Sequence, residues 1–242
     1  MYLHVPKNQN SKEGPTSDTT AMETPIAPIA IVGMSCRFPG GANSPEQFWE
    51  ILKDGLDAWT PVPPSRWNED AFFHPDPDQQ GMLNHRGGHF LTQDVAAFDG
   101  KFFGISPSEC AAMDPQQRLV LEVSSEALEN QGVTLEQVRG EDVGVYVAVF
   151  SQDYNLLQNA DVEDLNRYHA VGTGPAITAN RVSYILDLRG PSVTLDTGCS
   201  GSMVAIHQAC MSLRTGECSL ALAGGVNLML SPDQMVAMSH MR

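Results

Sequence analysis

The clearest candidate for chemistry in this sequence is Cys199, which lies in the small-residue run 196–202 (DTGCSGS). The β-prone residues 193–195 precede this run, and a long apolar stretch of helix-forming residues follows it, so we expect the thiol where a strand turns into a helix. Free N–H groups at a helix start carry partial positive charge and favour a nearby thiolate, which is the nucleophilic form. The spacing therefore predicts a nucleophilic cysteine.

The neighbours of Cys199 are consistent with acyl chemistry. Gly198 and Gly201 remove side-chain bulk, so a substrate carbonyl could approach the sulfur closely. The backbone N–H of Cys199 could then face a developing oxyanion, as in the strand-turn-helix arrangement of other nucleophiles. The alternative is a cysteine that only fills space in the core, which is the commoner role of this residue type. The residues alone leave both interpretations open.

The sequence gives weaker evidence for two other kinds of site, an aspartic protease loop and a metal site. Residues 196–198 (DTG) also match the loop of aspartic proteases, in which two such carboxylates share a proton, but this chain has one copy and a helical pattern follows it. His74, His85 and His89 lie in one loop-rich region, but their spacing matches no familiar ligand pattern. We therefore expect histidines that pack in loops, and we assign no metal site.

Composition narrows the class of protein. The 242 residues, 42% of them hydrophobic, can bury a large core, and 14 basic against 29 acidic residues give a net charge of -15, which argues against nucleic-acid binding. No segment reaches the roughly 18 apolar residues of a membrane helix. The cysteines are odd in number and lack CxxC spacing, so we expect reduced thiols and a cytoplasmic location. They are Cys36, Cys110, Cys199, Cys210 and Cys218.

Apolar runs and helix-start signals alternate along the chain. Residues 1–27 are rich in Ser, Thr, Pro, Lys and Asn, and we expect them to form a flexible leader. Three apolar runs predict buried strands, at residues 29–34, 143–150 and 219–225. Between these runs, capping signals predict helices that start near residues 45, 115 and 135, and residues 60–90 are rich in Pro and Gly, which predicts loops.

This alternation predicts an α/β fold with a largely parallel sheet. The helix after Cys199 is apolar on nearly every side, so we expect it to be sandwiched between layers. The sheet and this helix are the elements that must position the thiol.

Several segments together resemble the ketosynthase (β-ketoacyl synthase) domain of fungal iterative type I polyketide synthases. They are residues 190–202 (GPSVTLDTGCSGS), 29–40 (IAIVGMSCRFPG), 102–107 (FFGISP) and 113–118 (MDPQQR), and the likeness extends over residues 28–242. The resemblance implies a thiolase-like fold of two similar α/β halves, of which this chain supplies the first half with loop excursions and lacks the C-terminal half. It also implies a homodimer in the full domain.

The resemblance implies a role for Cys199 in polyketide, that is secondary metabolite, biosynthesis. In the family, the matching cysteine accepts an acyl chain from the phosphopantetheine thioester of an acyl carrier protein. It then releases that chain to the carbanion formed by decarboxylation of a malonyl thioester. Phosphopantetheine arrives as part of the substrate, so the resemblance implies no directly bound cofactor. From the net charge and the lack of a membrane-length apolar segment, we expect neither nucleic acid nor a membrane as a partner. Members of the family more often have Ala at the position of Gly198 and Ser at the position of Gly201. Because all of these residues are small, the differences leave room at the site.

The family's two catalytic histidines have no counterpart in this sequence. They lie in His-Gly-Thr-Gly and Asn-x-x-His segments beyond the cysteine, and neither segment is present, nor is the Gly-Phe-Gly loop that supplies the second oxyanion donor. His207 follows Cys199 by eight residues, about 12 Å along a helix, which exceeds the roughly 3 Å reach of proton transfer. His169 and His240 lie in no motif like the missing ones.

Two hypotheses follow from these observations. In the first, the chain is the N-terminal part of a ketosynthase, whose catalytic set is completed by sequence that this chain lacks, so that the chain alone is inactive. In the second, the chain is a truncated, non-catalytic relic or an interaction module. The coding sequence downstream of residue 242 distinguishes the two.

Overall fold

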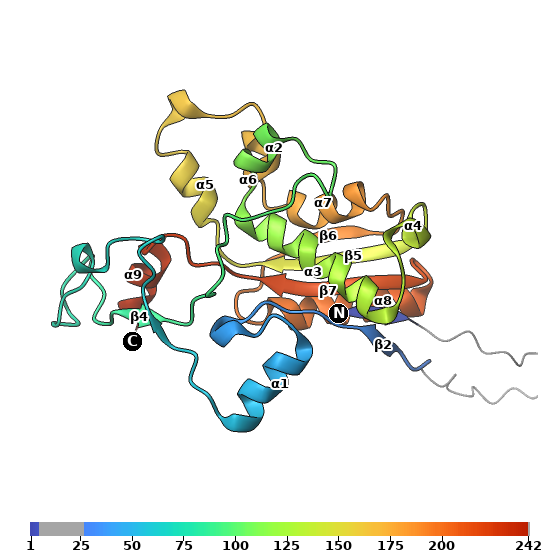
Figure 1. Cartoon of the computed structure of the whole chain (residues 1–242), viewed down its shortest axis with the longest axis horizontal. Helices are drawn as coiled ribbons and strands as arrows, with labels where there is room; N and C mark the ends of the chain where they lie inside the picture. The colour runs from blue at the N-terminus through green and yellow to red at the C-terminus, as the bar shows by residue number, and fades with distance from the viewer. Residues whose placement is uncertain (5–26, 242) are drawn as a thin grey trace, which may run out of the picture.

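A five-stranded mixed sheet forms the centre of the protein, in the computed structural model that describes residues 1–4 and 27–241 (Figure 1). The strand order across the sheet is β2-β1-β7-β5-β6. The strands are β1 (Tyr2–His4), β2 (Ala30–Gly33), β5 (Val143–Val149), β6 (Ser192–Leu195) and β7 (Leu220–Val226). A separate two-stranded sheet pairs β3 (Thr60–Pro61) with β4 (Gly87–Gly88).

Strands β5, β6 and β7 form the parallel part of the sheet. β5 lies between the other two, with Val145 opposite Ser192 on one side and Leu222 on the other. All seven residues of β5 are buried, as expected for a continuous apolar run covered on both faces. The strands expected at residues 143–150, 193–195 and 219–225 are therefore confirmed.

Strand β1 makes the sheet mixed instead of parallel, because it runs antiparallel to both β2 and β7. The flexible leader expected over residues 1–27 is therefore wrong for Tyr2–His4, whose two apolar side chains are buried. Residues 5–26 of that leader lie outside the described residues. The overall polar composition of residues 1–27 concealed the short apolar stretch at their start.

Strand β2 confirms the strand expected near residues 29–34, but not its burial. β2 lies at one end of the strand order, and the side chain of Ile31 is 56% exposed. An apolar run alone does not reveal how many neighbours a strand has, so the sequence predicted a buried strand at this position.

The helices begin and end near the predicted positions. Ser44 caps the first by accepting a hydrogen bond from the N–H of Gln47, Asp114 caps α3 through the N–H of Gln116, and Thr134 forms a capping box with α4. The helices are α1 (Pro45–Asp54), α2 (Pro107–Ala112), α3 (Pro115–Gln131), α4 (Leu135–Val138), α5 (Asp153–Gln158), α6 (His169–Thr173), α7 (Ile177–Ile185), α8 (Gly201–Thr215) and α9 (Asp233–Ser239).

The sheet is covered by α3 and α7 on one face and by α8 on the other (Figure 1). Each face has its own apolar cluster, centred on Leu121 and Val145 on the α3 side and on Ala205 and Ala209 on the α8 side. The sandwiched position expected for α8 is not observed within this chain, because the outer face of α8 is uncovered and Met203 is 68% exposed. An apolar helix needs a second layer, and the described residues do not supply one.

Residues 60–90 form the expected loop-rich excursion, which has a small core of its own around Trp67 and Phe90. Nearby, Phe98 and Phe103 stack on each other and pack against the main core, whereas Phe102 is 58% exposed. No helix formed by the described residues is long and apolar enough to cross a membrane.

Candidate active site

Cys199 lies in the short loop between β6 and α8, which is the strand-to-helix position that the sequence predicted, and its side chain is exposed. β6 ends at Leu195, and α8 begins at Gly201. The carboxyl ends of the parallel strands β5, β6 and β7 share one edge of the sheet, which is where α/β folds commonly place their sites. The Cys199 thiol is therefore accessible at the edge of the sheet where such folds commonly place their sites.

The loop around Cys199 is held by its own polar groups. The Asp196 carboxylate accepts a hydrogen bond of 2.8 Å from the N–H of Gly198, and the Ser200 hydroxyl donates one of 2.9 Å to the carbonyl of Thr197. Gly198 has a φ of +62°, in the left-handed region that favours glycine. The Asp196 carboxylate thus closes a turn, and a helix follows it, so the residues do not form an aspartic protease loop.

Close packing fixes the start of α8 against the sheet. A Cβ atom added at Gly201 would lie 2.6 Å from the Cβ of Ala148 near the end of β5, which is too short for two carbons. A Cβ added at Gly225 of β7 would lie 3.0 Å from the Cβ of Ser202. The first turn of α8 therefore sits directly on the ends of β5 and β7, and this contact positions the loop that carries Cys199.

The other four thiols are less accessible than Cys199. Cys36, Cys110 and Cys210 are half-buried, and Cys218 is buried. Desolvation raises the pKa of the Cys36 and Cys110 thiols and raises the pKa of Cys218 to about 11. All five cysteines are free thiols in the structure, as the sequence predicted. The geometry singles out Cys199 as the accessible one.

The histidines are spread over the fold. His207 lies on the exposed side of α8, His169 begins α6, and His240 follows α9. Among the described residues, no hydrogen bond joins the Cys199 thiol to a histidine. His85 Nδ1 lies 3.0 Å from the carbonyl oxygen of Gly87, and His89 Nε2 lies 3.2 Å from the Asp57 carboxylate, so these two loop histidines have separate partners.

A buried polar network was missed by sequence reasoning. The side-chain amide nitrogen of Gln116 donates a hydrogen bond of 3.0 Å to the carbonyl of Ser151. The side-chain oxygen of Gln116 accepts a hydrogen bond from the N–H of Leu228. The Asp153 carboxylate accepts hydrogen bonds from the N–H groups of Leu230 and Ser231 at 2.9 and 3.0 Å. The network joins the start of α3 to the segments that follow β5 and β7. The sequence gives no specific signal for it, because polar residues occur along the whole of α3.

Two charged side chains near this network, Asp114 and Arg181, are buried. Desolvation raises the pKa of the Asp114 carboxyl, against the opposing effect of its hydrogen bonds with Gln116. The Arg181 guanidinium is buried and donates to Gln117 at 2.8 Å and to the Glu109 carboxylate at 2.6 Å. A buried charge needs such partners, so this cluster holds α2, α3 and α7 together.

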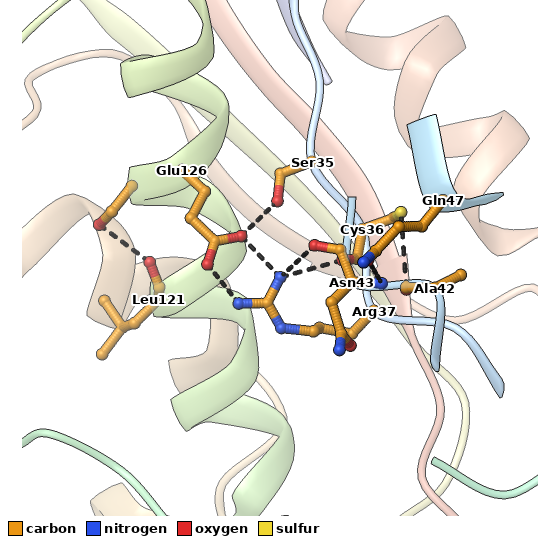
Figure 2. A network of polar contacts seen from close by, with 9 residues as sticks. Ser35, Cys36, Arg37, Ala42, Asn43, Gln47, Leu121 and Glu126 are labelled. Atoms are coloured by element: carbon orange, nitrogen blue, oxygen red, sulfur yellow. Dashed lines mark hydrogen bonds and ion pairs between the residues drawn. The ribbon is translucent and has the colours of Figure 1, made fainter. Parts of the chain in front are cut away.

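A second cluster fixes the segment after β2 to α3 (Figure 2). The Arg37 guanidinium forms a bidentate ion pair with the Glu126 carboxylate, which also accepts a hydrogen bond of 2.6 Å from the Ser35 hydroxyl. Arg37 donates further hydrogen bonds to the carbonyls of Cys36 and Asn43. The arrangement closes the turn that leads into α1.

A cavity of about 480 Å³ lies beside this cluster. Its lining includes Arg37, residues of α3 and the carboxyl end of β7, and it reaches Ser202 in the first turn of α8. Cys199 is not part of the lining. The cavity therefore adjoins the start of α8 without containing the thiol.

The family model "Beta-ketoacyl synthase, N-terminal domain" matches residues 27–242. The chain is 54% identical over 215 residues to the highly reducing polyketide synthase SAT13 of Stachybotrys chartarum, covering 88% of this chain and 9% of that protein. It is also 54% identical over 221 residues to the highly reducing polyketide synthase sdnO of Sordaria araneosa, covering 91% and 7%. The chain thus spans less than a tenth of the length of these relatives.

Solved structures agree with the sequence relatives. The oxazolomycin ketosynthase domain OzmH KS7 of Streptomyces albus has a TM-score of 0.79 and 37% identity, over 87% of this chain and 36% of that one. The ketosynthase from module 6 of the bacillaene synthase of Bacillus subtilis has a TM-score of 0.76 and 34% identity, over 88% and 34%. These likenesses confirm the thiolase-like α/β fold and its partial coverage. The chain belongs to the β-ketoacyl synthase family and corresponds to the N-terminal portion of a ketosynthase domain.

Proposed function

We propose that this chain supplies the acyl-accepting part of the ketosynthase of a fungal polyketide synthase, with Cys199 as the nucleophile. The observation that carries the proposal is the place of Cys199, exposed at the junction of β6 and α8. The sequence relatives are named highly reducing polyketide synthases, which supports an acyl thioester as the substrate class.

In the first step, the Cys199 thiolate attacks the carbonyl carbon of an acyl group carried on the phosphopantetheine arm of an acyl carrier protein. A new C–S bond forms to Cys199, and the bond to the pantetheine sulfur breaks, so that this sulfur leaves as a thiolate. The N–H of Cys199 donates to the oxyanion of the tetrahedral intermediate. Covalent capture separates acyl transfer from carbon–carbon bond formation.

In the second step, a malonyl thioester loses carbon dioxide, and the resulting carbanion attacks the acyl group on Cys199. A new C–C bond forms, and the Cys199 thiolate leaves. This step needs the histidines and the second oxyanion donor of the family, which this chain's sequence does not include, so residues outside the chain complete it. In the full synthase, we expect the ketosynthase to act as a homodimer in the cytoplasm.

Acylation of Cys199 tests the proposal directly. We expect incubation of the synthase with an acyl-pantetheine thioester to add one acyl mass to the tryptic peptide that contains Cys199. Cys199→Ala should abolish this adduct and reduce product formation by at least about 10³-fold, because the nucleophile is lost.

Cys210→Ala is the matched control, since it removes a nearby thiol that lies in α8, the helix after the Cys199 loop, and is half-buried in the α8-side core. The control should keep both the adduct on Cys199 and the product. An adduct on another cysteine, or full activity of Cys199→Ala, would disprove the role of Cys199.

A further inference from the structure

The Asp196 side chain lies just before Cys199 in sequence and holds the turn that leads to the thiol. It is exposed, and its carboxylate accepts a hydrogen bond of 2.8 Å from the N–H of Gly198. Asp side chains commonly bond to the backbone two residues further on in this way, and the bond fixes the local course of the chain. The turn that carries the nucleophile is therefore under the control of one side chain.

The backbone of Gly198 is held at both of its polar groups. Its N–H donates to the Asp196 carboxylate, and its carbonyl accepts a hydrogen bond of 3.0 Å from the N–H of Gly201 at the start of α8. Gly198 has a φ of +62°, and a glycine without such anchors adopts positive and negative φ with similar ease. The two hydrogen bonds thus select one conformation of a flexible residue.

This conformation determines the direction of the Cys199 N–H. The peptide bond between Gly198 and Cys199 is trans and planar, so the N–H of Cys199 points opposite to the carbonyl of Gly198. Because that carbonyl faces the N–H of Gly201, the Cys199 N–H faces away from the start of α8. A change in the conformation of Gly198 would turn this N–H.

We propose that Asp196 is a positioning residue for acyl transfer, and that it acts through its hydrogen bond to the Gly198 N–H and not through its charge. The inference rests on the proposed role of Cys199 as the acyl acceptor, in which the Cys199 N–H donates to the oxyanion. Loss of the hydrogen bond frees Gly198 to rotate, so the donor is out of place in part of the molecules. Oxyanion stabilisation depends on a donor that is already in place, and acyl transfer slows without it.

Two reactions of the same thiol separate positioning from access. Acylation by an acyl-pantetheine thioester passes through a tetrahedral oxyanion, whereas alkylation by iodoacetamide displaces iodide from a CH₂ carbon and forms no such oxyanion. In the synthase, we expect Asp196→Ala to slow acylation of Cys199 at least about tenfold and to change its alkylation less than about threefold. Peptide mass spectrometry over a time course measures both rates.

Asp196→Asn separates the hydrogen bond from the charge. The side-chain oxygen of asparagine accepts the same hydrogen bond and carries no negative charge. We expect this variant to acylate Cys199 within about threefold of the wild-type rate, because the anchor of Gly198 is kept. If Asp196→Asn is as slow as Asp196→Ala, the carboxylate acts through its charge and the proposal is wrong.

Asp161→Ala is the matched control. The Asp161 carboxylate accepts a hydrogen bond of 3.0 Å from the N–H of Glu163, also two residues further on, but in a different loop. Its removal should leave both rates at Cys199 unchanged. An equal fall of acylation and alkylation in Asp196→Ala, or a fall of acylation in Asp161→Ala as large as in Asp196→Ala, would overturn the proposal.

The inference and the proposed function fail in different ways. If the wild-type synthase forms no acyl adduct on Cys199, the role of Cys199 is wrong, and the role of Asp196 is wrong with it. If the wild-type synthase and Asp196→Ala acylate Cys199 equally fast, Cys199 keeps its role and only the positioning by Asp196 is disproved.

If Asp196→Ala does not fold, amide exchange in the wild-type protein and in Asp196→Asn decides the matter. The N–H of Gly198 should exchange at least about tenfold more slowly than in an unfolded chain in both proteins, because both supply an acceptor for it. A Gly198 amide that is unprotected in the wild-type protein would overturn the proposal. Protection in the wild-type protein that Asp196→Asn loses would also overturn it.

Discussion

At the scale of single residues, the five thiols differ chiefly in access to solvent. We expect iodoacetamide to alkylate Cys199 at least about tenfold faster than the other cysteines at pH 8, because Cys199 alone is exposed and burial raises the pKa of Cys36, Cys110 and Cys218. Peptide mass spectrometry over a time course measures the five rates. Equal rates would remove the support for a distinctive site.

The ionisation of Tyr2 should make the stability of the chain depend on pH. Burial and the charge of Glu141 raise the pKa of Tyr2 from 10.0 to about 12. Above pH 10 the unfolded chain therefore loses this proton before the folded chain does, so the free energy of unfolding falls as the pH rises from 10 to 12. The full loss attributable to Tyr2 is about 2–3 kcal/mol.

Tyr2→Phe tests this pH dependence, because phenylalanine has no proton to lose. Urea denaturation at pH 9, 10 and 11 should show a smaller loss of stability for Tyr2→Phe than for the wild-type chain. Other groups, such as Cys218, titrate in both proteins and cancel in the comparison. Parallel pH profiles would show that Tyr2 is not buried in the folded chain.

At the scale of elements, the contact between α8 and β5 determines where the Cys199 loop sits. Gly201→Ala would bring a Cβ to within 2.6 Å of the Cβ of Ala148, so we expect it to destabilise the chain by about 1–3 kcal/mol. Adding Ala148→Gly should restore about half of that loss, since it removes the opposing carbon. Chemical denaturation of the four proteins of this cycle gives the coupling.

The contact between α8 and β5 would be contradicted if the effects of Gly201→Ala and Ala148→Gly on the free energy of unfolding were additive. If Gly201→Ala and Ala148→Gly destabilise independently, the first turn of α8 does not rest on β5 in the way described. An additional readout is the alkylation rate of Cys199, which should change in Gly201→Ala and return in the double variant, because the loop moves with the helix start.

At the scale of the whole molecule, the uncovered face of α8 is the main feature. Met203 and Met211 of this helix are 68% and 42% exposed, and Val193 of β6 is 39% exposed. Contiguous exposed apolar surface favours association. We expect the isolated 242-residue chain to self-associate at micromolar concentration and to bind the apolar dye ANS; a monomer by analytical ultracentrifugation that binds no dye would contradict this.

Catalysis is also a property of the whole domain. We expect the isolated chain to form no condensation product from acyl and malonyl thioesters, since its sequence includes neither family histidine segment. Mass spectrometry of the reaction mixture tests this, with acylation of Cys199 as the positive control for a folded site. A β-ketoacyl product would show that the missing histidines are dispensable.

The sequence by itself determined where several helices start, where the parallel strands lie and that Cys199 lies between a strand and a helix. Capping residues such as Ser44 and Asp114 and the apolar run of β5 predicted helix starts and a strand that the structure confirms. The strand-to-helix place of Cys199 was predictable for the same reason, because local propensities and turn chemistry act over a few residues.

Only the tertiary structure decided which strands, helices and side chains contact one another. The insertion of Tyr2–His4 between β2 and β7, the exposure of Ile31 and the uncovered face of α8 depend on contacts between segments far apart in the chain. The same holds for Gln116 and Asp153, whose partners lie on segments distant in sequence. Periodicity describes which residues prefer burial, but the neighbour that buries them is set by long-range packing.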